Sequence, residues 1–588
     1  MRSINMVRRR LYDAFFNDVV EPALRRWLGN EDHLVPHESN PRVVDYSDAL
    51  RQGARFTVLF RKNLVAKRRY QSRGRRHKMI VNDQAKVSTF LAAQARLGDT
   101  EARIETVETH ISLVFLGPCI VFKLKRSIRF PYLDFSTPAL RLRTCQKEVD
   151  LNRRTAPTLY KAARRITRAS GGGLEFDGPG ELVDAVVEMA RFDENTLFDR
   201  LARRNELTPA LLTQLARKIA NFHDTAPIDR SRSGSAIMAS ALDINRRAMT
   251  SFDVLRSAEA TRLNSAIGDR FSRHRTALDE RARNGKVRRC HGDLHLRNIC
   301  LVDNEPTLFD CIEFNESIAT IDILYDLAFL VMDLWHQGLT SKANFTLNRY
   351  LDMSAEGAGL HLMPFFMAVR AAIRAHVNAA QANQASGERR ERLQQEAKDY
   401  LSSANKMLMQ TPAHLVAIGG LSGCGKSTVA ATIADRIGDV PGARVLSSDR
   451  IRKCLHGVVA EARLPAQAYS PEISEQVYHI MMTQAKAVLD AGHSVVVDAV
   501  FDRPEHRERI HNLARKVGVR FSGIWLDAPR DVLFSRVERR SGDPSDATVA
   551  VVAAQLARLV DVADWTHVDS SGTPEETAED VQAIINLA

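Results

Sequence analysis

The feature that most constrains the fold of this chain is a glycine-rich octapeptide, Gly420 to Ser427 (GLSGCGKS). The preceding apolar run, His414 to Ile418, predicts a buried strand, and the following run, Thr428 to Ile437, predicts a helix. The octapeptide fits the pattern GxxxxGK[ST], which binds phosphate where a strand enters the loop and a helix leaves it. Because such strand-loop-helix units build parallel sheets, we predict a doubly wound α/β domain over residues 411–588.

The residue types of this loop suit a nucleoside triphosphate. Its glycines let backbone N–H groups converge on phosphate oxygens, Lys426 reaches the β and γ phosphates, and Ser427 ligates Mg²⁺. A chance glycine turn is the alternative for the loop, and Cys424 is interpreted as a small tolerated side chain rather than a redox switch. The predicted nucleotide-binding residues are Gly420, Leu421, Ser422, Gly423, Cys424, Gly425, Lys426, Ser427 and Thr428.

Two acidic positions follow other predicted strands of the same region. Asp449 lies just past Val445 to Ser448, with Arg452 three residues further on, and Asp498 ends the apolar run Ser494 to Val497. The carboxyl ends of parallel strands lie on one edge of a sheet, so these residues should converge on the loop. Asp498 is therefore predicted to hold Mg²⁺ with Ser427. A plain surface turn is the alternative for the Asp449 segment.

These residues resemble the small P-loop kinases that phosphorylate hydroxyl groups, such as gluconate kinase and adenylylsulfate kinase. The resemblance implies that Asp449 activates the acceptor hydroxyl and that Arg452 orients it. It also implies a lid helix whose arginines close over the phosphates, with Arg536 and Arg540 as candidates in Asp531 to Arg540. An arginine-rich helix that simply faces solvent is the alternative for that segment.

A second motif lies in the middle of the chain, at Cys290 to Asn298 (CHGDLHLRN). Its chemistry suits phosphoryl transfer: Asp293 would take the proton of an acceptor hydroxyl, while Asn298 and the downstream Asp310 would hold Mg²⁺. His295 invites a metal-site interpretation, but no other His or Cys lies at ligand spacing, so a structural role is favoured.

The order and spacing of this region resemble the aminoglycoside phosphotransferase family, a relative of the protein kinases. The resemblance implies that Lys123, with Lys125 in reserve, contacts the nucleotide and pairs with Glu148. It further implies that Asp326 supports the catalytic loop. We therefore predict an α+β, two-lobed, protein-kinase-like domain over residues 88–410. The order of both regions resembles bacterial proteins that fuse such a domain to a C-terminal P-loop kinase-like ATP-binding domain.

The first 87 residues form a basic extension that matches no motif. The chain of 588 residues carries a net charge of +12, and residues 1–86 hold 19 Lys and Arg against nine Asp and Glu. The two larger regions are thus nearly neutral. Residues 61–78 contain nine basic and no acidic side chains, which suits an arm that binds nucleic acid or acidic lipid. A solvated, partly disordered extension is favoured instead, because no aromatic residues are spaced for base stacking.

Together these features predict a cytoplasmic enzyme with two nucleotide sites that uses ATP and Mg²⁺ to phosphorylate a hydroxyl group of a small molecule. Seven scattered cysteines without a CxxC pair favour a reducing compartment, and no apolar run is long enough to span a membrane. The alternatives are a nucleotide-gated nucleic-acid-binding protein and a kinase of RNA 5′ ends, both using the basic arm.

Overall fold

The computed structural model describes residues 76–97, 103–109, 111–130, 133–354, 356–539, 544–558 and 562–587. These residues form two compact units. The first contains the described residues up to Asp193 together with Ile312–Asn315, and the second contains Glu194–Cys311 and the described residues from Glu316 onward. The predicted basic arm, residues 61–78, lies outside the described residues except for the backbone of its last three positions, where helix α4 begins.

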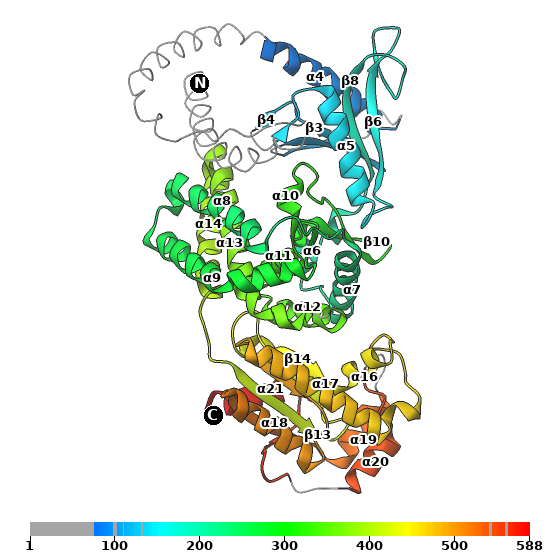
Figure 1. The fold of residues 1–588 in the computed structure, drawn as a ribbon. Helices are drawn as coiled ribbons and strands as arrows, with labels where there is room; N and C mark the ends of the chain where they lie inside the picture. The colour runs from blue at the N-terminus through cyan, green and yellow to red at the C-terminus, as the bar shows by residue number, and fades with distance from the viewer. Residues whose placement is uncertain are drawn as a thin grey trace, which may run out of the picture. The chain divides into compact units, whose positions relative to one another are not determined.

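The first unit is built on a six-stranded antiparallel sheet (Figure 1). The central strands are largely buried because apolar residues dominate them, as in Ile120–Lys125 (IVFKLK) and Leu182–Ala190 (LVDAVVEMA). The sheet order is β1 (Glu105–Glu108), β2 (Ser112–Leu116), β3 (Ile120–Lys125), β8 (Leu182–Ala190), β6 (Tyr160–Arg168) and β7 (Leu174–Phe176). A short hairpin, β4 (Arg129–Phe130) and β5 (Leu133–Asp134), leads to α5 (Pro138–Asn152), which the side chain of Thr137 caps.

Helix α4 (Arg76–Ala95) packs on this sheet. Its side chains Val87, Leu91 and Ala95 are buried in one core with Phe115 and Phe122, and Gln84 donates a hydrogen bond to the carbonyl of Lys125 at 3.0 Å. The helix runs across the predicted boundary at residue 87. The packed core therefore starts before residue 88, because the apolar stripe of α4 completes the sheet's hydrophobic face.

The second unit begins with a helical part that carries the CHGDLHLRN segment. Helices α11 and α13 form its centre and are buried on nearly every side, because their sequences are apolar around most of their circumference. The helices are α6 (Phe198–Arg203), α7 (Pro209–Thr225), α8 (Gly234–Ser251), α9 (Ala258–Arg283), α10 (Glu316–Ala319), α11 (Ile323–His336), α12 (Thr340–Met353), α13 (Met363–Gln384) and α14 (Gly387–Met407). Two small pairs of strands accompany them, β9 (Val287–Arg289) with β12 (Thr320–Asp322), and β10 (Ile299–Val302) with β11 (Glu305–Leu308).

The same unit continues into a five-stranded parallel sheet, which confirms the predicted α/β architecture of the C-terminal region (Figure 1). The strand order is β14 (Arg444–Ser447), β15 (Val495–Asp498), β13 (His414–Gly420), β16 (Arg520–Asp527) and β17 (Thr566–Asp569). The helices are α15 (Lys426–Ile433), α16 (Ser448–Leu455), α17 (Pro471–Asp490), α18 (Pro504–Val517), α19 (Arg530–Glu538), α20 (Val549–Leu556) and α21 (Pro574–Leu587). The predicted boundary at residue 411 falls inside the second unit.

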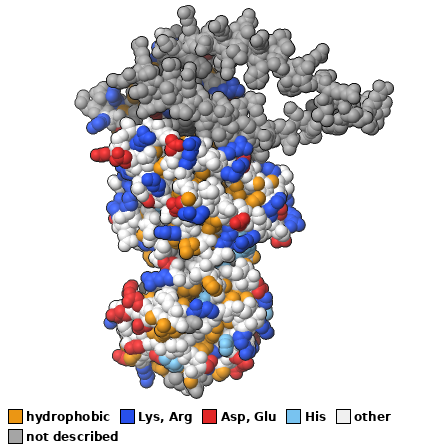
Figure 2. Space-filling view, turned by 90° about the vertical axis from the view of Figure 1, so that its left-hand side faces the viewer, with side chains coloured by type: hydrophobic (Ala, Val, Ile, Leu, Met, Phe, Trp, Pro, Cys, Tyr) orange, Lys and Arg blue, Asp and Glu red, His pale blue; other side chains and the backbone are white. Residues whose placement is uncertain are grey.

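Two surface properties bear on the sequence predictions. On the face seen in Figure 2, the Lys and Arg side chains of the described residues are mixed with Asp and Glu side chains. This mixture matches the near-neutral composition of the chain beyond residue 86. None of the described helices is long and apolar enough to cross a membrane.

The packing of α4 yields a test of where the folded domain starts. Replacing the fully buried Leu91 with Ala should lower the free energy of unfolding by about 2–5 kcal/mol, because a cavity is left under the sheet. Replacing the exposed Gln94 of the same helix with Ala should leave stability within about 0.5 kcal/mol. Urea unfolding of both variants measures the difference, and equal stabilities would contradict the assignment of α4 to the folded core.

Candidate active sites

The phosphate-binding loop has the backbone that its glycines predict. Strand β13 ends at Gly420, and Gly420, Gly423 and Gly425 have φ values of 138°, 93° and 92°, a region that favours glycine. A Cβ at Gly420 would lie 2.6 Å from the Leu526 carbonyl oxygen, so a larger residue does not fit there. Helix α15 begins directly at Lys426, so its N-terminal amides face the loop.

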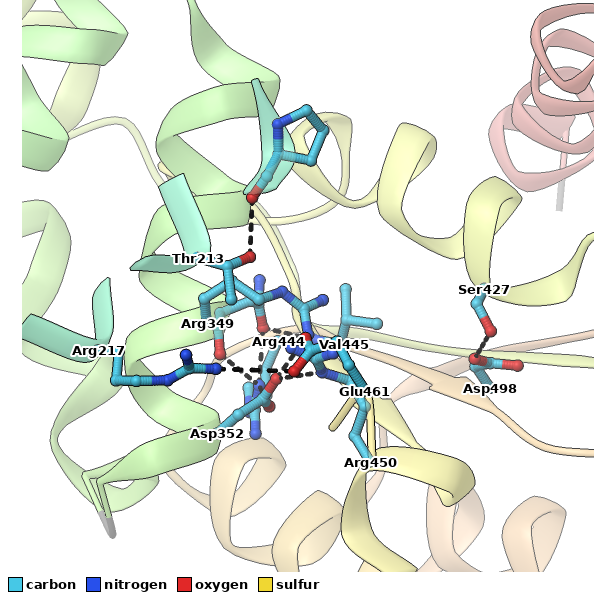
Figure 3. Close-up of polar contacts among 12 residues, drawn as sticks. Thr213, Arg217, Arg349, Asp352, Ser427, Arg444, Val445, Arg450, Glu461 and Asp498 are labelled. Atoms are coloured by element: carbon cyan, nitrogen blue, oxygen red, sulfur yellow. Dashed lines mark hydrogen bonds and ion pairs between the residues drawn. The ribbon is translucent and has the colours of Figure 1, made fainter. Parts of the chain in front are cut away.

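The two polar residues that close the loop are already held in place. Ser427 Oγ donates a hydrogen bond to Asp498 Oδ2 at 2.6 Å (Figure 3). Lys426 Nζ turns back to the carbonyl of Leu421 at 2.9 Å. Burial raises the pKa of the Cys424 thiol, which disfavours the thiolate needed for redox chemistry and supports the interpretation as a packed small residue.

Parallel pairing brings Asp449 to the same edge of the sheet. Asp498 is in register with Ile418 on one side and Ser447 on the other, and Asp449 follows Ser447 in the first turn of α16. Burial raises the pKa of Asp449 and the nearby Asp498 carboxylate raises it further, against hydrogen bonding from Ser545 and the charges of Lys426 and Arg452. Asp449 thus lies at the sheet edge where Asp498 ends β15, close enough for the charges of Asp498 and Lys426 to act on its carboxylate.

Arg452 lies on the same helix, and its guanidinium is buried. It donates to the carbonyl of Ala468 at 2.7 Å and lies over the ring of Tyr469, 4.7 Å from its centroid. In this structure Arg452 therefore binds the α16–α17 connection, beside Asp449.

Of the two predicted lid arginines, the structure describes only Arg536. Arg536 in α19 donates to the carbonyl oxygens of Ser570 at 2.7 Å and Gly572 at 2.9 Å, so it binds the loop after β17 in this structure. Arg540 lies outside the described residues. The lid assignment stays a prediction for both.

Two residues near this loop, Gln555 and Asp546, carry no sequence signal. Gln555 Oε1 in α20 accepts the backbone N–H of Ser422 at 2.9 Å. Asp546 accepts from Lys453 Nζ at 2.5 Å and from the Tyr469 hydroxyl at 2.6 Å, which ties the segment before α20 to α16. Such contacts join residues about 80–130 positions apart, so only the tertiary structure identifies them.

The second candidate site is the loop between β9 and β10. Asn298 Nδ2 donates to Asp293 Oδ2 at 3.0 Å, and the β10–β11 hairpin brings Asn298 beside Phe309 and therefore near Asp310. Burial alone would raise the pKa of Asp293, but His295, with Nε2 at 3.4 Å, and the more distant His291 and Arg374 hold it below its usual range. Asp293 is thus a carboxylate at neutral pH, as a proton acceptor requires.

Asp326 supports this loop from below, as the resemblance predicts. Its carboxylate accepts the backbone N–H groups of His291 at 3.1 Å and Gly292 at 2.8 Å, and it contacts His223 Nε2 at 3.2 Å. Arg370 of α13, which the sequence did not single out, donates to the carbonyl of Gly292 at 3.2 Å. The loop is therefore fixed through its backbone from two helices.

One group of side chains in the described part of the chain has the composition of a metal site: His223, Cys290 and Asp326, all buried. Each member already has a hydrogen-bond partner, with His223 Nδ1 3.0 Å from the Tyr350 hydroxyl. Burial raises the pKa of Cys290 well above its ordinary value, so its sulfur stays protonated. The group serves as a support for the loop, and His295 is not part of it.

In the first unit, both predicted lysines contact Glu148. Lys123 Nζ lies 2.7 Å from Glu148 Oε1, and Lys125 Nζ lies 2.5 Å from Glu148 Oε2 and 2.5 Å from Glu313 Oε1. Burial opposes the charge of Lys125, yet the two glutamates raise its pKa. Glu313, which sequence reasoning left unassigned, balances the second lysine. Lys123 keeps 14% of its side chain exposed while Lys125 is enclosed, which favours Lys123 as the ligand-facing lysine.

Comparisons with known proteins match two separate regions of the chain. Residues 133–362 match the family model of a phosphotransferase enzyme family, and residues 415–561 match that of an AAA domain. An uncharacterized protein of Mycobacterium tuberculosis is 29% identical over 491 residues, which is 81% of this chain and 94% of the relative. An adenylyl-sulfate kinase of Myxococcus xanthus is 27% identical over 145 residues, 25% of this chain and 71% of the relative.

Among solved structures, a choline kinase from Cryptosporidium parvum covers 55% of this chain and 96% of its own, with 10% identity and a TM-score of 0.35. The two family matches confirm the predicted fold class, a kinase-like domain followed by a P-loop kinase-like domain, and the prediction of a kinase-type enzyme.

The raised pKa of Asp449 predicts a pH-dependent effect on stability. Because the pKa of this carboxyl is raised in the folded protein, its ionisation is less favourable there than in the unfolded chain, and this difference lowers stability at neutral pH. Asp449→Asn should therefore raise the melting temperature at pH 7 by on the order of 1–3 °C. The gain should shrink as the pH falls through the raised pKa, because the wild-type carboxyl then takes up a proton.

Melting curves in EDTA at pH 7 and at pH 4.5 measure this difference. Asp580→Asn, at an exposed position of α21, is the matched control and should change nothing. A melting temperature of Asp449→Asn below that of the wild type at pH 7 would contradict the electrostatic description of the site.

Proposed function

We propose that the protein is an ATP- and Mg²⁺-dependent phosphotransferase with two nucleotide sites, which phosphorylates a hydroxyl group of a small molecule. The observation that carries the proposal is the Ser427–Asp498 hydrogen bond at the phosphate-binding loop, with Asp449 on the same sheet edge. Oxygen ligands for Mg²⁺, a phosphate-binding lysine and a second carboxylate for the acceptor then lie together.

The residues of the C-terminal site fit Mg-ATP. Ser427 Oγ and Asp498 supply the hard oxygen ligands that Mg²⁺ prefers, and bound Mg²⁺ would offset the negative charge of the phosphates. Lys426 exchanges its contact with the Leu421 carbonyl for the phosphates. Asp449 accepts the proton of the acceptor hydroxyl, and Arg452 orients the acceptor beside it. The loop amides stabilise charge on the phosphoryl oxygens because they are fixed before the reaction.

At the middle site, other residues take the same chemical roles. Asp293, kept ionised by its neighbours, accepts the hydroxyl proton. Asn298 and Asp310 are the candidate Mg²⁺ ligands, and Lys123, fixed by Glu148, is the candidate phosphate contact. No covalent intermediate with the protein is needed at either site.

A small-molecule acceptor is favoured over a nucleic acid. The Myxococcus xanthus relative is named an adenylyl-sulfate kinase, whose acceptor is a small molecule, and the chain beyond residue 86 carries nearly balanced charge. The basic arm, on which the nucleic-acid alternatives depend, lies almost wholly outside the described residues, so no structural observation supports them.

Two substitutions separate the sites. Lys426→Ala should remove the C-terminal component of ATP turnover, and Asp293→Asn the middle component, each by about 100-fold or more, because each removes a group that acts on the phosphates or on the proton. The double variant should be inactive. Turnover is measured as ADP release with Mg²⁺ and a panel of hydroxyl compounds, and the phosphorylated product is identified by its mass.

Matched controls remove the same chemical groups elsewhere. Lys406→Ala and Asp303→Asn lie at exposed positions and should keep wild-type turnover. Wild-type turnover by the double variant would refute the assignment of both sites. Transfer of phosphate to a 5′-hydroxyl oligonucleotide in place of every small molecule would refute the acceptor class.

A further inference from the structure

Helix α12 belongs to the kinase-like part, yet it presents a polar stripe to the P-loop part. Asn344, Asn348 and Asp352 are four residues apart, so they lie on one face of the helix. That face meets β14, the edge strand of the parallel sheet. Asn344 Nδ2 and Asn348 Nδ2 donate to the carbonyl of Ala443 at 3.0 and 3.2 Å, and Asn348 Oδ1 accepts the N–H of Val445 at 2.8 Å. The side chains of α12 thus take the place of a further strand.

Asp352, at the end of the stripe, forms ion pairs with three arginines (Figure 3). Its carboxylate lies 2.8 Å from Arg349 Nη1, 2.8 Å from Arg444 Nη1 and 2.7 Å from Arg450 Nε. Arg444 opens β14, and Arg450 lies next to Asp449 in α16. Arg349 and Arg444 are buried, so their pairing is little screened by solvent. One carboxylate therefore fixes both ends of the segment 444–450.

This segment needs an external support. Helix α16 has only eight residues, and its N-cap Ser447 makes no side-chain hydrogen bond to it. A helix so short has little stability of its own, so its direction depends on tertiary contacts. Asp449 and Arg452, the proposed acceptor-binding residues, both project from it. A cavity of about 230 Å³ lined by Asp352, Arg444 and Arg450 lies beside the ion pairs, so loosened arginines would have room to turn.

We propose that Asp352 is a positioning residue of the P-loop site, supplied by the kinase-like part, and that it aims Asp449 and Arg452 through Arg444 and Arg450. The proposal rests on the proposed function of the P-loop site. Both parts then contribute to that site. The nucleotide loop belongs to the P-loop part, while α16, which bears Asp449 and Arg452, is held by α12 of the kinase-like part.

The opposite side of α12 gives an internal control. Tyr350 contacts His223, which contacts Asp326 under the catalytic loop of the middle site. A change at Asp352 leaves this contact in place. Loss of the Asp352 carboxylate should therefore affect the P-loop site and spare the Asp293-dependent turnover.

The test compares Asp352→Asn with Asp399→Asn, an exposed position of α14, each in the Asp293→Asn background that isolates P-loop turnover. We expect Asp352→Asn to lower kcat at least 10-fold while KM for ATP changes less than about two-fold, because the loop residues are untouched. In the Asp449→Asn background, Asp352→Asn should have no further effect on kcat, since the group that it positions is already gone. Arg450→Gln, which leaves Asp352 two arginines, should give a smaller loss of the same kind.

Hydrogen exchange of full-length Asp352→Asn with otherwise wild-type sequence supplies a readout that does not need turnover. Amides of residues 444–455 should exchange at least 10-fold faster than in the wild type, and those of residues 420–428 should not change. Unchanged exchange and kinetics in Asp352→Asn and Arg450→Gln would overturn the proposal, as would parallel losses of ATP affinity and kcat. A wild-type protein without ATP turnover would refute the proposed function instead, and exchange would then decide the positioning role alone.

Discussion

The parallel pairing of β15 with β13 and β14 is the constraint on which the C-terminal site depends. Because Asp498 pairs in register with Ile418 and Ser447, the end of each strand delivers its next residues to one edge. The glycine loop, the Mg²⁺ candidate Asp498 and Asp449, the proposed acceptor carboxylate, meet there without long loops. Burial at this edge raises the pKa of Asp449, and the like charge of Asp498 raises it further. Lys426 and Arg452 offset part of that repulsion.

In the middle site, buried hydrogen bonds hold the loop that bears Asp293 in place. Asp326 holds the backbone of His291 and Gly292, so Asp293 is aimed by a loop that cannot shift without breaking buried bonds. In the first unit, Lys123, Lys125, Glu148 and Glu313 form a neutral set of four charges. Replacing one of the four with a neutral residue would leave a buried charge without full compensation, and such substitutions strongly destabilise a fold.

Helix α12 contacts residues that support both candidate sites of the second unit. Its asparagines bind the edge strand of the sheet, its Asp352 binds the segment that bears Asp449, and its Tyr350 contacts the support of the catalytic loop. A nucleotide-binding part and a kinase-like part that shared only a linker would need no such polar stripe. The stripe instead joins the two parts by direct side-chain contacts.

Local pattern was enough to single out most of the candidate phosphoryl-transfer residues. GxxxxGKS, an acid at a strand end and HxDxxxxN each place their chemistry within a few residues, and strand or helix period fixes where the side chains face. The same reasoning found that Lys123 and Lys125 share a face, which the contacts of both with Glu148 agree with. It could not find Glu313, Arg370, Gln555 or Asp352, because an isolated charged or amide residue in a helix or loop resembles any solvated one.

The sequence by itself thus determined the kinase-like and P-loop kinase-like folds, the order of their motifs and the kinase type of reaction, since these follow from short-range spacing and backbone geometry. Only the tertiary structure decided which partners hold those motifs in place, where the first core begins and that α12 braces the P-loop sheet. Those features depend on contacts between residues tens to hundreds of positions apart. Their strength comes from burial and complementary charge, which exist only once the chain has folded.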